Sequence, residues 1–358
     1  MGVAQFIRTM KDVGILHLAA GSVPLEPSSL DEARKLARHP WENKAIETLA
    51  SWWNSEACME MRTSGSTGAP REIQHSKTAI EASALRTLAH FQLEPGAHAA
   101  LAMPAEFVGG MMMLVRAVLG GLNLDVLEPK MAPQFPTTHF DFVALTPAQA
   151  RAMCLDQKQV ENMATWKTLL LGGAPLLANW MDDLPVGLEV FESFGMTETI
   201  SHFAVRQWSP VREEAFRCLP GIVVGANPDG ALQVILPGQS VLQSNDEVEI
   251  LDEQTFRWMG RLDDVINSGG VKVHPHVVST VLSRIISEPF VVFGRPHDAL
   301  GEEVVLRIHA HEEPANAQDL RTQFQQLILE SLPRHHAPRA IEWKPLDQTE
   351  SGKWKSPR

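Results

Sequence analysis

Hydroxyl, glycine and cationic residues gather in one short stretch early in the chain. Residues 63–73 read Thr-Ser-Gly-Ser-Thr-Gly-Ala-Pro-Arg-Glu-Ile. Glycines let successive backbone N–H groups converge on an anion, hydroxyls add donors, and a guanidinium adds charge. The spacing is not that of a Walker A loop. The stretch therefore predicts a polyphosphate-binding loop, and a Ser/Gly-rich surface turn is the alternative. The residues assigned to it are Thr63, Ser64, Gly65, Ser66, Thr67, Gly68 and Arg71.

The loop resembles the phosphate-binding signature of the AMP-forming adenylating enzymes, the superfamily of acyl-CoA synthetases, peptide-synthetase adenylation domains and luciferases. Their pattern is roughly Thr-Ser-Gly-Thr-Thr-Gly-x-Pro-Lys-Gly, and this chain departs from it at Ser66, Arg71 and Glu72. Arg71 keeps the positive charge with a different geometry. Glu72 adds a negative charge near the phosphates, and nothing in the sequence explains it.

Two later segments resemble the same family in the same order. The loop Gly173, Ala174, Pro175 is similar to one that lies beside the adenine, and Ser193-Phe194-Gly195-Met196-Thr197-Glu198 resembles Tyr-Gly-x-Thr-Glu. The resemblance implies that Phe194 stacks on the purine, Thr197 binds the α-phosphate and Glu198 holds Mg²⁺, which prefers carboxylate and phosphate oxygens. Taken alone, the Thr-Glu pair could simply start a helix.

Ribose and hinge residues follow further along the chain. Ser244-Asn245-Asp246 stands where the family has Thr-Gly-Asp, which implies that Asp246 accepts hydrogen bonds from the ribose hydroxyls. A solvated turn aspartate is the alternative. The segment from Gly260 to Ile266 resembles Gly-Arg-x-Asp-Asp-x-Ile, so Arg261 is expected to reach ribose or phosphate and Asp263 to act as the hinge of a small domain.

The C-terminal part supplies the remaining site residues that the resemblance implies. Gly269, Gly270 and Lys272 belong to a glycine loop that would face coenzyme A. Thr349-Glu350-Ser351-Gly352-Lys353 resembles the family's Thr-x-Ser-Gly-Lys, whose lysine swings into the active site. A frayed, solvated chain end is the alternative for Lys353.

Three segments (residues 103–111, 171–176 and 195–202) are most similar to the o-succinylbenzoate–CoA ligases of menaquinone synthesis, particularly the short forms. Their substrate keeps a second carboxylate after activation, so its pocket should carry a cation or strong donors. Each candidate could instead be a surface residue. The candidates are Ser201 and His202, which closely follow Glu198, and then Arg116 and Lys272.

The elements that position these residues follow from the hydrophobic pattern. Apolar runs at 124–127, 142–145 and 168–171 alternate with helical patterns, which predicts parallel α/β layers. Residues 1–62 look mixed and helical, and residues 211–260 predict a small antiparallel β-subdomain. The resemblance implies a large N-terminal domain over 1–262, shortened at its N-terminus, and a small mobile α+β lid domain over 263–358.

Composition narrows the functional classes. A formal charge of −12 argues against a nucleic-acid partner. Three distant cysteines, Cys58, Cys154 and Cys218, fit neither a disulfide framework nor a zinc site and indicate a reducing compartment. No stretch reads as a signal peptide or a membrane span. We therefore expect a cytoplasmic protein; its oligomeric state stays open, a homodimer included.

The implied reaction is ATP-dependent activation of a carboxylic acid to an acyl adenylate, with Mg²⁺, and transfer of the acyl group to coenzyme A. The resemblance favours o-succinylbenzoate as the acid. Two alternatives remain. One is another acyl- or aryl-CoA ligase, and the other is a nucleotide-binding relative without turnover, which Arg71, Glu72 and the short N-terminal region slightly favour.

Overall fold

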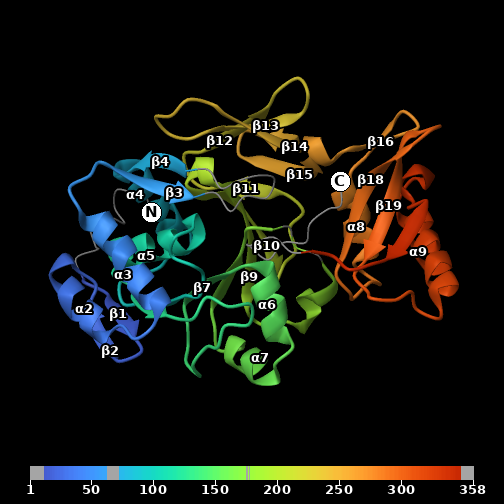
Figure 1. The fold of residues 1–358 in the computed structure, drawn as a ribbon. Helices are drawn as coiled ribbons and strands as arrows, with labels where there is room; N and C mark the ends of the chain where they lie inside the picture. Colours follow the sequence, from blue (N-terminus) through green and yellow to red (C-terminus); the bar gives the residue numbers. More distant parts are fainter. Residues whose placement is uncertain (1–11, 63–71, 175, 177, 348–358) are drawn as a thin grey trace. The chain divides into compact units, whose positions relative to one another are not determined.

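The computed structural model describes residues 12–62, 72–174, 176 and 178–347, which form two compact units (Figure 1). The first unit comprises residues 1–176, 183–222 and 236–238, and the second comprises residues 177–182, 223–235 and 239–358. The boundary expected at residues 262–263 is the hinge about which the C-terminal lid would rotate. It stays a prediction.

A mostly parallel sheet forms the centre of the first unit. Its strand order is β11-β10-β9-β8-β7-β5-β6-β1-β2. The strands from β9 to β1 run parallel to their neighbours, whereas β2, β10 and β11 are antiparallel. Every residue of β7 and β8 is buried, as expected for central parallel strands. The strands are β1 (Ile15–Leu18), β2 (Gly21–Pro24), β5 (His98–Leu101), β6 (Asn123–Val126), β7 (Phe142–Leu145), β8 (Thr168–Leu171), β9 (Glu189–Met196), β10 (Ser201–Ser209) and β11 (Phe216–Cys218).

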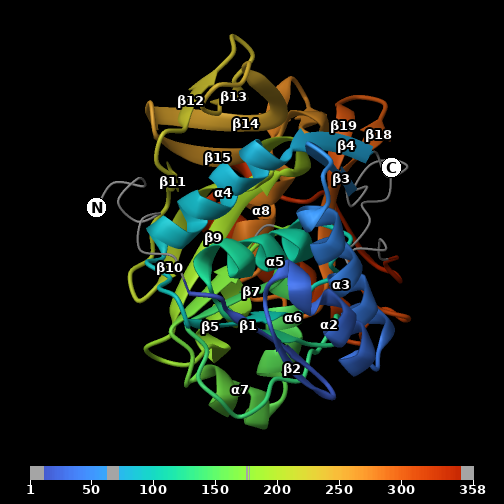
Figure 2. The ribbon, with the colours of Figure 1, turned by 90° about the vertical axis from the view of Figure 1, so that its left-hand side faces the viewer.

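Helices pack on this sheet, and α4 and α5 cross in front of β9 and β10 in Figure 2. Helix α4 begins where the Ser76 hydroxyl accepts a hydrogen bond from the Ala79 amide at 3.2 Å. The three methionines of α5 are all buried and belong to the core. The helices are α2 (Leu30–Leu36), α3 (Pro40–Trp53), α4 (Lys77–His90), α5 (Val108–Gly120), α6 (Pro147–Cys154) and α7 (Gln157–Met163).

A separate antiparallel pair, β3 (Cys58–Arg62) and β4 (Glu72–Ser76), flanks the predicted phosphate loop. Its register places Arg62 opposite Glu72, and the two side chains form an ion pair at 3.3 Å. This contact gives Glu72, which the sequence left unexplained, a structural partner at the base of the loop.

The second unit contains two sheets. One is the antiparallel sheet β12-β13-β14-β15, and the other has the order β17-β16-β19-β18 with β20 paired to β19. Phe324 and Ile328 of α9 are buried in a core with Val304 and Leu306, so the apolar stripe of this helix faces the core. The elements are β12 (Val223–Ala226), β13 (Ala231–Ile235), β14 (Leu242–Asp252), β15 (Thr255–Arg261), β16 (Ile266–Ser268), β17 (Val271–Val273), β18 (Phe290–His297), β19 (Gly301–Ile308), β20 (Ala340–Trp343), α8 (Pro275–Leu282) and α9 (Ala317–Ser331).

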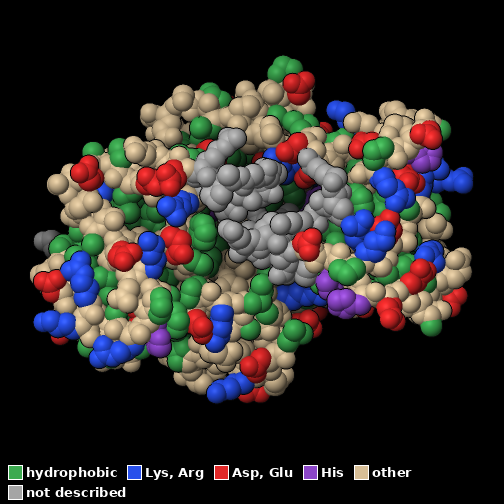
Figure 3. Space-filling model, in the orientation of Figure 1, with side chains coloured by type: hydrophobic (Ala, Val, Ile, Leu, Met, Phe, Trp, Pro, Cys, Tyr) green, Lys and Arg blue, Asp and Glu red, His purple; other side chains and the backbone are tan. Residues whose placement is uncertain are grey.

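Acidic and basic side chains are interspersed on the face drawn in Figure 3 rather than gathered by sign. Within the described ranges, no helix combines the length and the apolar character needed to cross a membrane.

Candidate active site

The predicted adenine loop leaves the carboxyl end of β8 beside β9. The Ser193 hydroxyl donates to the Leu171 carbonyl at 3.0 Å and so ties the two strands together. A Cβ at Gly172 would lie 2.2 Å from that hydroxyl oxygen, so a larger residue here would displace the hydroxyl from its bond to Leu171. Gly173 has a φ of +85° and is exposed, and Ala174 is half-buried. Loops at this end of parallel strands are where ligands bind in open α/β sheets.

Phe194 is held by aromatic packing. Its ring centroid lies 5.7 Å from that of Phe203 and 5.1 Å from that of Phe216. The next residue lets β10 approach closely, because a Cβ at Gly195 would lie 2.3 Å from the carbonyl oxygen of Ser201. The ring proposed to stack on the purine therefore has a fixed backbone and fixed neighbours.

Residues Thr197–Thr199 form a short 3-10 helix directly after β9. The Thr199 hydroxyl accepts from the Met196 amide at 3.0 Å and donates to the Ser201 carbonyl at 2.8 Å. His75 of β4 donates from Nε2 to the Thr197 carbonyl at 2.8 Å. Thr197 is buried and Glu198 is exposed. An exposed carboxylate on a backbone fixed at both ends fits Mg²⁺, which takes one or two protein carboxylates together with phosphate oxygens and water.

Two consecutive residues after Glu198 adopt left-handed backbone conformations. The φ of Ile200 is +53° and that of Ser201 is +79°. Such conformations cost on the order of 1–3 kcal/mol each in non-glycine residues and concentrate at functional sites. The Ile200 side chain is buried, and its carbonyl accepts from the Ser83 hydroxyl at 2.7 Å. The turn is thus over-determined by its surroundings, and it places Ser201 against Arg116 of α5 and His202 against Thr87 of α4.

Arg116 of α5 meets that turn inside the first unit. Only 2% of Arg116 is exposed, and its Nη2 donates to the Ser201 hydroxyl at 3.1 Å. Nη1 lies 3.7 Å from the Met113 sulfur, and Nε has no hydrogen-bond partner among the described residues. Burial lowers the pKa of Arg116 to about 9, so the guanidinium remains charged at neutral pH. No carboxylate of the described ranges forms an ion pair with it.

His202 completes this group as a neutral side chain. It is 6% exposed, and its ring nitrogens lie 3.4 Å from the Ser201 hydroxyl and 3.3 Å from the Thr87 hydroxyl. Burial, and then the positive charge of Arg116, hold the pKa of His202 well below its usual value. The structure therefore brings together three of the four residues proposed for the second carboxylate, which are Arg116, Ser201 and His202.

The predicted ribose and hinge residues adjoin one another within the second unit. Asp246 of β14 is opposite Arg261 of β15 in the strand register. The Trp258 indole N–H donates to the Asp246 carboxylate at 3.0 Å. Burial raises the pKa of Asp246, and the Trp258 hydrogen bond opposes that shift. Asp246 is half-buried inside a strand, which disfavours the solvated-turn alternative.

Arg261 and Asp263 form a bidentate pair, with two N–O distances of 2.9 Å. This hydrogen bonding is the main cause of a raised pKa for Arg261. Gly269 and Gly270, with φ values of +61° and +80°, form the two-residue turn between β16 and β17. Lys272 follows on β17 and is exposed.

Some predicted residues lie outside the described ranges, and their roles stay predictions. They are Thr63, Ser64, Gly65, Ser66, Thr67, Gly68, Arg71, Pro175 and Lys353.

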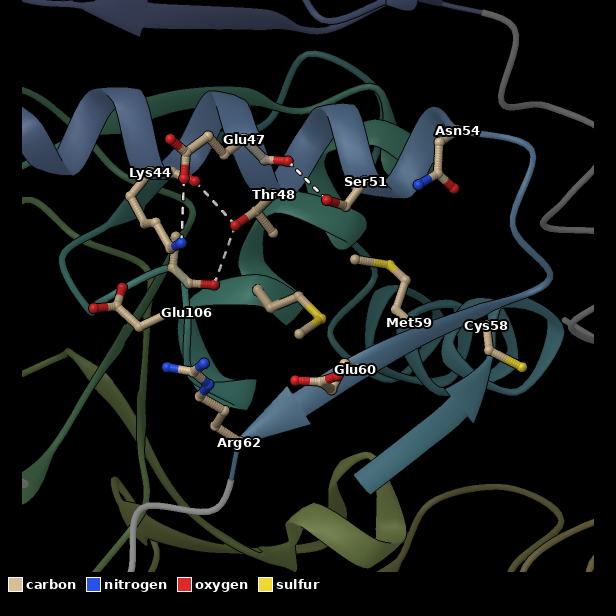
Figure 4. A pocket seen from close by; sticks show the side chains of 12 residues that line it. Lys44, Glu47, Thr48, Ser51, Asn54, Cys58, Met59, Glu60, Arg62 and Glu106 are labelled. Carbon is tan, nitrogen blue, oxygen red and sulfur yellow. Dashed lines mark hydrogen bonds and ion pairs between the residues drawn. The ribbon is translucent and has the colours of Figure 1, made fainter. Parts of the chain in front are cut away.

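A pocket of about 530 Å³ lies between α3, β3 and the residues that lead into α5 (Figure 4). It is lined by three carboxylates, Glu47, Glu60 and Glu106, and by two cations, Lys44 and Arg62. This charge balance disfavours a polyphosphate, and none of the predicted site residues with a described position lines the pocket. We do not assign the nucleotide to it.

Comparison with known proteins shows the family of this chain. The sequence model of the family described as "AMP-binding enzyme" matches residues 11–259. The chain belongs to the AMP-binding enzyme family. It is 28% identical over 279 residues to a Mycobacterium tuberculosis protein named "Probable 2-succinylbenzoate–CoA ligase", with 71% of each chain covered. It is 26% identical over 310 residues to a Staphylococcus aureus 2-succinylbenzoate–CoA ligase, with 77% of this chain covered.

The chain spans 62% of the length of the staphylococcal relative. A solved structure matches over a larger share of both chains. It is an AMP-forming acyl-CoA synthetase/AMP-acid ligase II-like protein from Dyadobacter fermentans, 30% identical, with a TM-score of 0.60 and coverage of 89% of this chain and 93% of that chain. Family and fold thus agree with the sequence-based expectation of an adenylate-forming enzyme with a large α/β domain and a small C-terminal domain.

Two residues with positioning contacts escaped the sequence reasoning. His75 bonds the backbone beside Glu198, and Trp258 bonds Asp246. Trp258 stands in the segment that leads into the hinge motif, so its proximity to Asp246 could have been inferred from a β14–β15 hairpin. His75 gave no signal, because its partner is a backbone carbonyl 122 residues away.

Proposed function

We propose that this protein is an AMP-forming acid–thiol ligase that activates o-succinylbenzoate (2-succinylbenzoate in the names of its relatives) and transfers it to coenzyme A. Family membership and the names of the relatives support the reaction class. The observation that carries the choice of acid is the buried Arg116, which donates to Ser201 and has no carboxylate partner in the described part of the chain.

A buried, unpaired cation costs several kcal/mol of desolvation, and a bound anion offsets that cost. A guanidinium binds a carboxylate through a planar fork, often by two hydrogen bonds, and the Ser201 hydroxyl offers another donor. An acid that keeps a second carboxylate after activation would supply this anion. The neutral His202 would border the same group without adding charge.

In the first half-reaction, an oxygen of the substrate carboxylate attacks the α-phosphorus of ATP, and the bond to pyrophosphate breaks as pyrophosphate leaves with the electron pair. Both reactants are anionic, so catalysis depends on positioning and on cations aimed at the developing charge. Lys353 would bridge carboxylate and phosphate oxygens, and Arg71 would hold the departing phosphates. Phe194 would stack on the purine and Asp246 would bind the ribose. Mg²⁺ held on Glu198 would neutralise further phosphate charge.

In the second half-reaction, the lid would rotate about Asp263, withdraw Lys353 and present the Gly269–Gly270 turn. The thiol of coenzyme A loses its proton to solvent and attacks the acyl carbon, and AMP leaves with the electrons of the former acyl–oxygen bond. Breaking the Arg261–Asp263 pair would accompany this rotation. The cytoplasm, which supplies ATP and coenzyme A, is the proposed location.

Acid-dependent ATP–pyrophosphate exchange tests the proposal. We expect exchange with o-succinylbenzoate and much weaker exchange with benzoate, which lacks the second carboxylate. Faster exchange with a monocarboxylic acid would replace this assignment by another acyl- or aryl-CoA ligase. ATP binding without exchange under any acid of the panel would instead favour the non-catalytic alternative.

A further inference from the structure

A row of polar side chains crosses neighbouring strands near one edge of the first unit's sheet. The strands involved are β2, β1, β6 and β5, and β7 and β8 separate them from β9. In the strand register Ser22 is opposite His17, His17 is opposite Asp125, and His98 is opposite Asn123, two residues before Asp125. Because side chains alternate between faces along a strand, these residues share one face.

Three of these side chains converge at their polar ends. One ligand atom from each of His17, His98 and Asp125 lies within 4.8 Å of the other two. His98 Nε2 is 3.1 Å from Asp125 Oδ1. Zn²⁺ binds nitrogen and oxygen ligands at about 2.0–2.2 Å in a tetrahedral arrangement, so adjacent ligand atoms lie about 3.3 Å apart. The His98–Asp125 distance of 3.1 Å matches that requirement, and the ligand atom of His17 lies within 4.8 Å of both.

The second nitrogen of each imidazole has a partner of the kind that ligating histidines use. His98 Nδ1 donates to the His139 carbonyl at 3.0 Å, and His17 Nδ1 lies 2.7 Å from the Ser22 hydroxyl. The His139 carbonyl can only accept, so it fixes the tautomer of His98, and both contacts hold the orientation of the rings, as the outer partners of metal-binding imidazoles do. Phe140 also stacks on His98 with 4.5 Å between ring centroids.

The tautomer of His98 makes its contact with Asp125 informative. When Nδ1–H donates to a carbonyl, the lone pair of neutral His98 is on Nε2 and faces a carboxylate oxygen. Two lone pairs at 3.1 Å repel each other unless a cation lies between them. That cation is either a proton shared by two atoms or a metal ion bound by three. The nearby ligand atom of His17 favours the metal.

We propose that His17, His98 and Asp125 form a binding site for a divalent transition-metal ion of the Zn²⁺ class, with a remaining coordination position for water. Imidazole and carboxylate ligands suit such ions. The side chains of His98 and Asp125 are 26% and 15% exposed, so an ion can enter while most of the site stays enclosed.

Calorimetric titration of tag-free, nucleotide-free protein with Zn²⁺ tests this site. We expect one tight equivalent with proton release, and the visible absorption of tetrahedral Co²⁺ when Co²⁺ is used. Removing a ligand by His98→Gln or Asp125→Asn should weaken binding by more than about 100-fold, and Ser22→Ala, which removes an outer partner, by about 10-fold. The matched control is the double variant His311→Gln/His335→Gln, which removes two exposed imidazoles of the second unit and should bind as the wild type does.

X-ray absorption of the wild-type zinc complex should show two imidazole ligands, and this measurement needs no variant to fold. Absence of a tight equivalent in the wild type, or unchanged affinity in a folded His98→Gln variant, overturns the proposal and leaves His98 and Asp125 as a proton-sharing pair. Neither readout depends on pyrophosphate exchange, so a failure of the proposed ligase activity would not be mistaken for a failure of this site.

Discussion

Replacing Arg116 by methionine separates substrate recognition from stability. Methionine has a similar length, carries no charge and can pack beside Met113 in α5. The variant removes the only donor to Ser201 that comes from α5 among the described contacts. We therefore expect Arg116→Met to lose selectivity for an acid with a second carboxylate while the fold persists.

The size of the loss follows from the contact. A hydrogen bond to a charged group contributes about 1.5–3 kcal/mol, and about 1.4 kcal/mol corresponds to tenfold. Losing the guanidinium should therefore lower kcat/KM for o-succinylbenzoate by roughly 10- to 100-fold. For benzoate, which has no second carboxylate to bind Arg116, kcat/KM should change less than about threefold.

Arg116→Met should lower activity but should not lower the stability of the fold. Burial puts the folded-state pKa of Arg116 at about 9, below that of the unfolded chain. Between these two values the unfolded state binds more protons, so the free energy of unfolding rises with pH above about 9. At neutral pH both states are protonated, and the buried charge costs stability in full. Arg116→Met should therefore leave the free energy of unfolding unchanged or raise it by up to about 3 kcal/mol.

Steady-state pyrophosphate release with both acids, together with urea unfolding, measures these quantities. Arg86→Met is a matched control, because Arg86 is a half-buried cation of α4 whose pKa is also lowered by burial. Equal losses with both acids, together with a fall in stability, would show that Arg116 is a structural residue and would refute the assignment. An equal loss of selectivity in Arg86→Met would show that the effect is not specific to Arg116.

The remaining predictions concern the two half-reactions and pH. Lys353→Ala should slow adenylation by roughly 10²–10³-fold and leave thioester formation from preformed acyl adenylate unchanged. Single-turnover assays of each half-reaction measure both rates. Equal losses in the two half-reactions would refute the moving-lid mechanism. Asp246→Asn should raise KM for ATP about tenfold, which is the effect of one charge-assisted hydrogen bond. Trp258→Phe should raise KM less, because it removes only the supporting hydrogen bond to Asp246. An unchanged KM for ATP in both variants would refute the ribose-binding role of Asp246. Because the pKa of His202 is depressed in the folded state, His202 is protonated in the unfolded chain at a higher pH than in the folded protein. As pH falls below about 6.5, the free energy of unfolding should therefore drop by up to about 1.4 kcal/mol per pH unit. Urea unfolding at about pH 7.5, 6 and 5 should show a flatter profile in His202→Asn, and an identical slope would contradict the buried, neutral state.

The strongly patterned elements were predictable from sequence. The runs at 142–145 and 168–171 became β7 and β8 with the same bounds, because strands buried on both faces consist of uninterrupted apolar residues. Helix α4 likewise carries both its apolar spacing and its Ser76 cap in the sequence. The motifs around Phe194 and Asp246 were recognisable through their resemblance to the family pattern, whereas the residues alone left a helix start and a solvated turn open.

The edge strands were less predictable. Residues 1–62 look mixed and helical, and α2 and α3 confirm the helical part, but the sequence did not indicate where β1, β2 and β3 lie. Four-residue strands give too few alternations to distinguish from irregular structure. The sequence also did not indicate that Arg116 is buried beside Ser201 whereas Lys272 is exposed. Burial of a cation depends on the packing of α5 against β10, and spacing along the chain does not report that packing.

The hydrogen bond from His75 to the Thr197 carbonyl links the strand that follows the predicted phosphate loop to the backbone beside Glu198. His75 stands on the strand that emerges from the predicted phosphate loop, and the bonded carbonyl belongs to the peptide unit leading into Glu198. A shift of that strand is therefore transmitted to the backbone of the proposed metal carboxylate. The triphosphate and the cation should consequently bind cooperatively: each should raise the affinity for the other through His75, which contacts neither ligand.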